Sequence, residues 1–151
     1  MLKGIPDILG PDALWMIAAM GHGDTLAVVD RNYPLHSQHS RVVTLAGVDS
    51  TQAIAALASL LPIDTFVSPS VWAMVPDDDP AAEIATHGEA GRILSAAENR
   101  PIEVAALRRT EFYVMARKAF GAVLTSESRP FSCFILTKGV VFPESDQESD
   151  Q

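Results

Sequence analysis

The chain has 151 residues, 48% of them hydrophobic, and its 19 acidic and 11 basic residues give a formal net charge of −8. This length and composition suit a single domain with a substantial core and exclude an intrinsically disordered protein. The acidic balance argues against a nucleic-acid-binding protein, because such proteins need a basic surface to contact phosphates.

Short helices and strands alternate in the first half of the chain. Pro11 suits the first position of a helix, and Gly21 can take the left-handed conformation that ends one. Asp49 and Gln52 have the spacing of a capping box and predict a second helix. Apolar, β-branched runs predict buried strands. The predicted elements are helices at 11–20 and from Asp49 onward, and strands at 25–29, 42–45 and 71–75.

The second half continues this alternation. Asp79-Pro80 predicts the start of a long helix, which Gly88 and Gly91 weaken by about 1 kcal/mol each. Thr110 is predicted to cap another helix. The predicted elements are helices at 79–97 and after Thr110, and strands at 103–107, 122–125 and 133–141. Six strands with four helices predict an α/β protein, a three-layer α/β/α sandwich around a mixed, roughly six-stranded sheet, because not every connection holds a helix.

One folded domain is expected at residues 1–143, followed by an acidic flexible tail at 144–151. The tail reads ESDQESDQ and contains four acidic residues and no basic one, so it carries half of the net charge. No apolar run approaches the length of a bilayer span, and prolines and aspartates interrupt the apolar N-terminus, unlike a signal peptide. The single cysteine, Cys133, cannot form an internal disulfide, which favours a reducing, cytoplasmic location.

His22 is the most promising residue for chemistry. It lies between Gly21 and Gly23, where a predicted helix ends and a strand begins. The glycines leave the imidazole uncovered, and an exposed imidazole that titrates near neutrality can transfer protons. A simple turn built on two glycines is an equally good interpretation. By contrast, His87 beside Gly88 is predicted to be a surface histidine.

Asp30 and Arg109 each follow a predicted strand. In open α/β sheets such strand ends line the ligand crevice, where a carboxylate can bind sugar hydroxyls or orient a histidine. The fork of donors on Arg109 suits vicinal oxygens of a polyhydroxyl ligand. The alternatives are a loop cap for Asp30 and a solvated side chain for Arg109.

Other kinds of site find little support in the sequence. A metal is not expected, because the candidate ligands match no metal-binding motif. There is no dinucleotide-binding fingerprint, Walker loop or G-x-S-x-G elbow, and no neighbour in the sequence suggests an activated Cys133. The metal-ligand candidates considered are His22, Asp24, Asp30, His36 and His39.

Several segments in order resemble the RbsD/FucU family of ribose pyranases and L-fucose mutarotases. They are MLKGIP, MGHGDT, VVDRNYPLHS, LPIDTF, RRTEFY with ARKAF, and ILTKGVV, from Met1 to about Val141. The resemblance implies a compact α/β/α fold in ring-shaped homo-oligomers, pentamer-based rings or decamers, with sites between neighbouring subunits. It also implies a cofactor-independent reaction that interconverts the anomers or ring forms of a free monosaccharide.

The resemblance also implies roles for individual residues. His22 matches the family's catalytic histidine and Asp30 its sugar-binding aspartate. Arg109 matches an arginine of the fucose-type branch, where ribose-type members tend to have histidine, and so favours the fucose-type branch. His36 and Tyr113 match a histidine and a tyrosine that fucose-type members carry, and both are expected to lie at the sugar site.

One stretch departs from the family pattern. Phe131-Ser132-Cys133 stands where the family usually shows Tyr-x-Asn, whose polar groups contact the sugar. Two lost neutral hydrogen bonds correspond to about 1–3 kcal/mol, or roughly 5- to 150-fold in affinity. This change is expected to shift the substrate toward a less hydroxylated or differently configured sugar, with Ser132 as a candidate replacement donor.

The leading hypothesis is an isomerase, a mutarotase that acts on a fucose-like free aldose by acid/base ring opening and reclosure at His22. The alternative is a non-catalytic or weakly catalytic sugar-binding or regulatory protein on the same fold, motivated by Phe131 and Cys133. A metal-dependent hydrolase is a distant third. The expected ligand is a monosaccharide, with no metal, nucleic acid or membrane.

Overall fold

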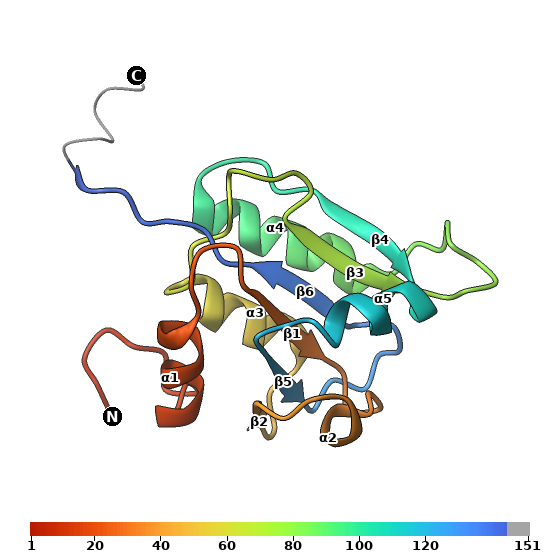
Figure 1. Cartoon of the computed structure of the whole chain (residues 1–151), viewed down its shortest axis with the longest axis horizontal. Coiled ribbons are helices and arrows are strands. Elements are labelled where there is room, and N and C mark those ends of the chain that lie inside the picture. Colours follow the sequence, from red (N-terminus) through yellow and green to blue (C-terminus); the bar gives the residue numbers. More distant parts are fainter. Residues whose placement is uncertain (145–151) are drawn as a thin grey trace.

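The computed structural model describes residues 1–144, so the predicted acidic tail lies, apart from Glu144, outside the described residues (Figure 1). No helix in this part of the chain combines the length and apolar character needed to span a bilayer. Five helices and six strands follow one another along it, and they alternate except for the last two strands. They are α1 (Pro11–Ala19), β1 (Thr25–Val29), α2 (Leu35–Gln38), β2 (Val42–Leu45), α3 (Ser50–Ala58), β3 (Val71–Val75), α4 (Ala85–Glu98), β4 (Val104–Arg108), α5 (Arg109–Ala116), β5 (Gly121–Thr125) and β6 (Phe134–Thr137).

All six strands form one mixed sheet in the order β2-β5-β1-β6-β3-β4. β1 pairs with β5, β5 with β2, and β3 with β4 in parallel, whereas β6 is antiparallel to both β1 and β3. Because β6 is antiparallel to both neighbours, the other five strands all point the same way. Their carboxyl ends therefore meet at one edge of the sheet, here called the carboxyl edge, and their amino ends meet at the opposite, amino edge.

Helices cover both faces of the sheet, which confirms the predicted α/β fold with a mixed six-stranded sheet (Figure 1). Successive side chains of a strand point to opposite faces. Leu26 and Val28 of β1 accordingly pack in the core under α1, α3 and α4, and Ala27 and Val29 pack in a second core with α5 and α2. All four side chains are fully buried, as expected for a central strand covered on both faces.

The local signals of the first half predicted its elements well. The strands at 25–29, 42–45 and 71–75 are confirmed. The capping box is also confirmed: Asp49 Oδ1 accepts a hydrogen bond from Gln52 N at 2.8 Å, and Gln52 Oε1 accepts one from Asp49 N at 3.0 Å. The short helix α2 was not predicted and lies inside the stretch expected to be a polar loop.

The predicted boundaries were wrong where local signals competed with tertiary contacts. α4 begins at Ala85 rather than at residue 79, because Asp79 closes a turn with the Pro76 carbonyl instead of opening a helix. Thr110 does not cap α5; its N and Oγ1 both donate to Asp77 Oδ1 at 3.1 Å. β6 ends at Thr137 instead of residue 141, since only an isolated bridge continues the pairing.

Candidate active site

A cavity of about 250 Å³ opens at the carboxyl edge of the sheet. Its lining comes from segments that the topology brings together there: the ends of β1 and β3, the start of α5 and the turn that precedes β6. Of the residues predicted for the site, five line this cavity: Asp30, Arg109, Tyr113, Phe131 and Cys133. The strand order explains this gathering, because α/β sheets bind ligands outside the carboxyl ends of their strands.

Asp30 follows β1 directly and is almost fully buried. One carboxylate oxygen accepts a hydrogen bond from Asn32 N at 3.1 Å, which closes the turn after the strand. Cys133 lies beside it, with Sγ 3.4 Å from Asp30 N. Burial, with the negative charge of Asp30, raises the pKa of the Cys133 thiol well above its ordinary value. Cys133 is therefore a neutral thiol in the cavity wall and not an activated nucleophile.

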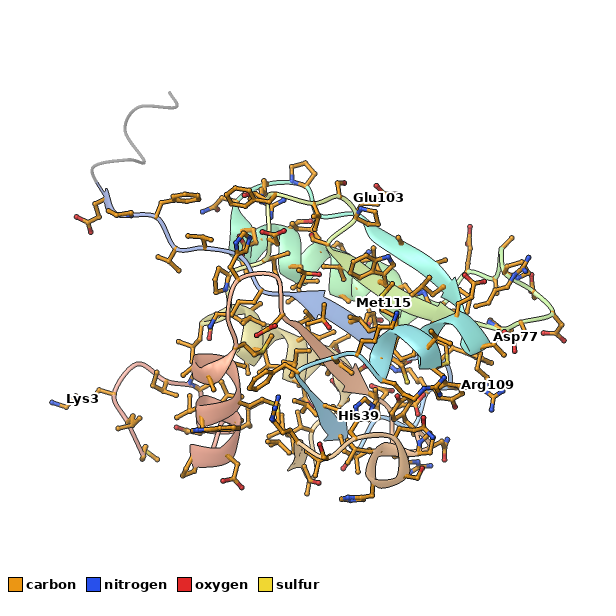
Figure 2. The ribbon with its side chains drawn as sticks, viewed as in Figure 1. Lys3, His39, Asp77, Glu103, Arg109 and Met115 are labelled. Carbon is orange, nitrogen blue, oxygen red and sulfur yellow. The ribbon has the colours of Figure 1, made fainter. Side chains whose placement is uncertain are left out.

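Arg109 and Tyr113 are one helical turn apart at the start of α5. The Arg109 guanidinium carbon lies 4.9 Å from the centroid of the Tyr113 ring, a cation–π contact that orients the guanidinium. Figure 2 shows Arg109 at the same end of the sheet as Asp77, which binds the next residue of the helix. The Tyr33 ring packs against the Tyr113 ring at a tilt of 43°, with 5.4 Å between the centroids. The Tyr33 hydroxyl lies 2.9 Å from Nε2 of His39.

Three predicted site residues lie outside the cavity lining: Ser132, His36 and His22, the last of which is described below. Ser132 is fully buried, and its Oγ lies 2.8 Å from Thr86 Oγ1 at the start of α4. It is therefore engaged with the protein instead of facing the cavity. His36 is exposed on α2. His87, predicted to be on the surface, is instead half-buried, with Nε2 2.9 Å from the Phe131 carbonyl oxygen.

His22 lies at the amino edge and forms a pair with a residue that the sequence reasoning missed. Its Nε2 is 2.8 Å from Asp64 Oδ1, and Asp64 is only 2% exposed. Burial opposes ionisation of Asp64, but hydrogen bonds from His22 and from the backbone of Phe66 and Val67 outweigh it and lower its pKa. The ionised carboxylate holds an imidazole that is 43% exposed. LPIDTF contains Asp64, but only the tertiary fold pairs it with His22.

The backbone around His22 is tied to the end of β6. Lys138 Nζ donates to the carbonyl oxygens of Ile17 and Met20, at 2.7 and 2.6 Å, and so caps the end of α1. The backbone of Lys138 accepts a hydrogen bond from Gly23 N at 2.9 Å. Gly23 has a φ of 86°, which glycine adopts without strain. The glycine-flanked turn therefore presents His22 from a fixed backbone.

The whole length of β1 separates His22 from the cavity. His22 precedes the strand and Asp30 follows it. Five residues at about 3.3 Å per residue give a separation of roughly 16 Å, longer than a monosaccharide. One sugar therefore cannot contact both His22 and Asp30 of the same chain. No group of three or more metal-ligating side chains occurs among residues 1–144.

Comparisons with known proteins agree with this architecture. Residues 3–141 match the model of the RbsD / FucU transport protein family. The fucose mutarotase of Mus musculus is 38% identical over 146 residues, 93% of this chain and 95% of its own length. The L-fucose mutarotase of Histophilus somni (strain 129Pt) is 33% identical over 141 residues, 93% and 97% of the two chains.

A solved structure extends the similarity to three dimensions. The crystal structure of the fucose mutarotase from Streptococcus pneumoniae in complex with L-fucose has a TM-score of 0.84 at 30% identity. The match covers 93% of this chain and 100% of that one. By its nearly full-length match to the family model and to these relatives, the chain belongs to the RbsD/FucU family.

Proposed function

We propose that this chain interconverts the anomers of a fucose-like free aldose by opening and reclosing the sugar ring, without a cofactor. The chain is an enzyme of the isomerase class, as its similarity to mutarotases over nearly its full length shows. The observation that supports the proposal is that the polar groups suited to this reaction lie in two separate places on the chain. A His–Asp pair suits proton transfer, and a separate cavity suits sugar hydroxyls.

His22 is proposed to move the proton. A carboxylate only accepts hydrogen bonds, so Asp64 assigns the proton of the neutral imidazole to Nε2 and leaves Nδ1 as a base. Ring opening requires the anomeric hydroxyl to lose a proton and the ring oxygen to gain one. Nδ1 of His22 takes the first proton and, as imidazolium, supplies one when the ring opens. Asp64 stabilises the imidazolium by its negative charge.

The cavity at the carboxyl edge is proposed to hold the sugar. The carboxylate of Asp30 accepts hydrogen bonds from hydroxyls, and the guanidinium of Arg109 donates to them. The rings of Tyr113 and Phe131 offer apolar surface to the C–H faces of the sugar. Phe131 presents carbon where a tyrosine would present a hydroxyl, which favours a sugar with fewer hydroxyls, as in a 6-deoxy aldose.

A second copy of the chain is proposed to complete the site, because β1 keeps His22 and Asp30 of one chain apart. Large apolar side chains close to the His22 turn support this arrangement. Phe66 is 64% exposed and its ring lies 4.8 Å from the His22 ring, and Val67 is exposed next to it. Exposed apolar surface of this kind marks an interface. In a homo-oligomer it would be buried while His22 of one copy reaches the cavity of the next.

Saturation-exchange NMR on candidate aldoses tests the proposed activity. Wild-type protein should exchange the anomers of at least one fucose-like sugar faster than the buffer does, and His22→Ala should not. Acceleration equal in the two proteins for every aldose would overturn the proposal.

A mixing experiment tests the shared site. His22→Ala and Asp30→Asn are each expected to be inactive. After the two are unfolded, mixed in equal amounts and refolded together, about a quarter of sites combine a native His22 with a native Asp30 in a two-copy site. Recovery to about a quarter of wild-type activity supports a site between copies, and no recovery contradicts it.

A sugar-binding or regulatory protein is the second candidate. It is favoured by the cavity wall, where Phe131 offers no hydrogen-bonding group and Cys133 only a buried thiol. Calorimetry that finds tight sugar binding, together with NMR that finds no faster exchange, would support it. Fast anomer exchange would exclude it.

A further inference from the structure

The turn that forms one wall of the cavity is attached to the start of α4. His87 Nε2 lies 2.9 Å from the carbonyl oxygen of Phe131, and Thr86 Oγ1 lies 2.8 Å from Ser132 Oγ. Thr86 is 1% exposed, so its bond is shielded from water. Two consecutive residues of α4 thus hold two consecutive residues of the turn.

Phe131 needs such support because of its backbone conformation. Its φ is 58°, in the left-handed region that residues with a Cβ rarely adopt. A residue in this region stays there only where its surroundings hold it. The conformation directs the Phe131 ring to the cavity while the carbonyl oxygen reaches α4.

The environment of His87 suits a fixed hydrogen-bond donor. Its ring packs edge-on against Phe134, with 5.6 Å between ring centroids. Burial lowers the pKa of His87. This effect outweighs the hydrogen bonds to the backbone carbonyls of Phe131 and Met74, which raise the pKa. A carbonyl oxygen only accepts hydrogen bonds, so the 2.9 Å contact with the Phe131 carbonyl oxygen is a hydrogen bond when Nε2 carries the proton of the neutral imidazole.

We propose that His87 is a positioning residue of the sugar site: its bond to the Phe131 carbonyl holds the left-handed turn that places the Phe131 ring against the sugar. The proposal rests on the function proposed above and assigns a role within that site. His87 does not line the cavity, so it affects the sugar through Phe131. Loss of the bond leaves a half-buried carbonyl oxygen without a donor and lets the turn relax. Sugar binding then weakens, while proton transfer at His22 is retained.

Matched variants separate the hydrogen bond from the packing. His87→Phe keeps an aromatic ring against Phe134 and removes the donor, whereas His87→Gln keeps an N–H group at the position of Nε2. Arg92→Gln, on an exposed position of the same helix, is the control. In NMR exchange kinetics, His87→Phe should raise KM about five- to tenfold with kcat changed less than about twofold. His87→Gln should restore most of the affinity, and Arg92→Gln should behave as wild type.

A structural role alone would lower the amount of folded protein in His87→Phe without changing the KM of the folded fraction. An unchanged KM, a loss confined to kcat, or a His87→Gln variant as weak as His87→Phe would each overturn the proposal.

A second readout does not depend on catalysis. Amide hydrogen exchange of residues 131–133 should be about tenfold faster in His87→Phe than in wild type and His87→Gln, and equal exchange overturns the proposal. If the wild type accelerates no aldose, the proposed function fails and this measurement still decides the role of His87.

If His87→Phe does not fold, imidazole ¹⁵N spectra of the wild type decide. The Nε2–H form supports the proposal, and the Nδ1–H form contradicts it.

Discussion

Nε2 of His22 lies 2.8 Å from Oδ1 of Asp64, although 42 residues separate the two along the chain. The carboxylate is fixed before any sugar arrives, because Asp64 is buried and its other oxygen accepts a hydrogen bond from Val67 N at 3.1 Å. The pair therefore sets both the orientation and the tautomer of the histidine. The other ring nitrogen, Nδ1, is left without a proton, as the proposed proton transfer requires.

Replacing Asp64 by asparagine should lower kcat strongly with little change in KM. The amide presents a donor or a neutral oxygen to Nε2, so neither the tautomer nor the imidazolium is stabilised as before. We expect a fall of roughly 10²-fold or more, a general acid–base effect. Saturation-exchange NMR measures it, with Asp7→Asn at an exposed position as control. A kcat within twofold of wild type would show that Asp64 only supports the fold.

Gly139→Ala should disturb the His22–Asp64 pair, because Gly139 packs against the backbone of Asp64. A Cβ at Gly139 would lie 2.8 Å from the Asp64 Cα and from the Ile63 carbonyl oxygen, both of them backbone atoms. The backbone must shift, so the free energy of unfolding should fall by about 1–3 kcal/mol and kcat should fall with it. Chemical denaturation and exchange NMR measure the two effects.

Gly91→Ala is the control for Gly139→Ala, since it adds the same methyl group where there is room for it. Gly91 lies inside α4, and its Cβ would meet only ordinary contacts, with Val104 at 3.6 Å and the Ile102 carbonyl oxygen at 3.9 Å. This variant should therefore be more stable by about 0.5–1 kcal/mol with unchanged kcat. A Gly139→Ala variant that resembled Gly91→Ala would mean that the Asp64 backbone tolerates the methyl group.

The sequence predicts most of the fold because the decisive signals are local. The apolar run at 25–29 is a strand buried on both faces, and Asp49 with Gln52 caps α3 through atoms three residues apart. The predicted start of α4 is wrong because it also rests on a local signal, Asp79-Pro80. Asp-Pro is also a turn signal, and the Pro76 carbonyl bonds to Asp79 to make that turn.

The site was predictable only in part. That Asp30 and Arg109 line one cavity follows from a general rule, because strand ends of α/β sheets meet at one edge. The pairing of His22 with Asp64 and the bond from His87 to Phe131 depend on contacts 42 and 44 residues apart, which no local pattern encodes. The separation of His22 from the cavity follows from strand direction, which the sequence did not reveal.

Glu127 should make the fold sensitive to acid. Hydrogen bonds from Arg129 and from the backbone outweigh burial and lower the pKa of Glu127 to about 2, against an ordinary value of 4.5. Because the pKa is lower in the folded chain than in the unfolded chain, the ionised carboxylate stabilises the fold at pH values above 4.5. This stabilisation is lost as the pH falls from 4.5 toward 2. Because Arg129 is partly in water, the contribution at neutral pH is about 2–3 kcal/mol.

Glu127→Gln tests this linkage. The variant should be less stable than wild type at pH 7, and the difference should shrink as the pH falls from 4.5 toward 2. Denaturation curves across this range measure it, and Glu103→Gln at an exposed position should show no such dependence. A difference that is constant with pH would assign the loss to packing and not to ionisation.

Phe131→Tyr should strengthen binding of a sugar that carries a hydroxyl opposite this ring. The ring lines the cavity, so a hydroxyl on it adds one neutral hydrogen bond to the ligand, a gain of roughly 2- to 10-fold in affinity. Anomer exchange measured over a range of concentrations of L-galactose, which carries a 6-hydroxyl where L-fucose has a methyl group, should give a lower KM at unchanged kcat, because His22 is not altered. Phe120→Tyr, against Arg41 and away from the cavity lining, should leave both values unchanged. Equal KM values for Phe131→Tyr and wild type would contradict the prediction and mean that the 6-hydroxyl does not lie against this ring.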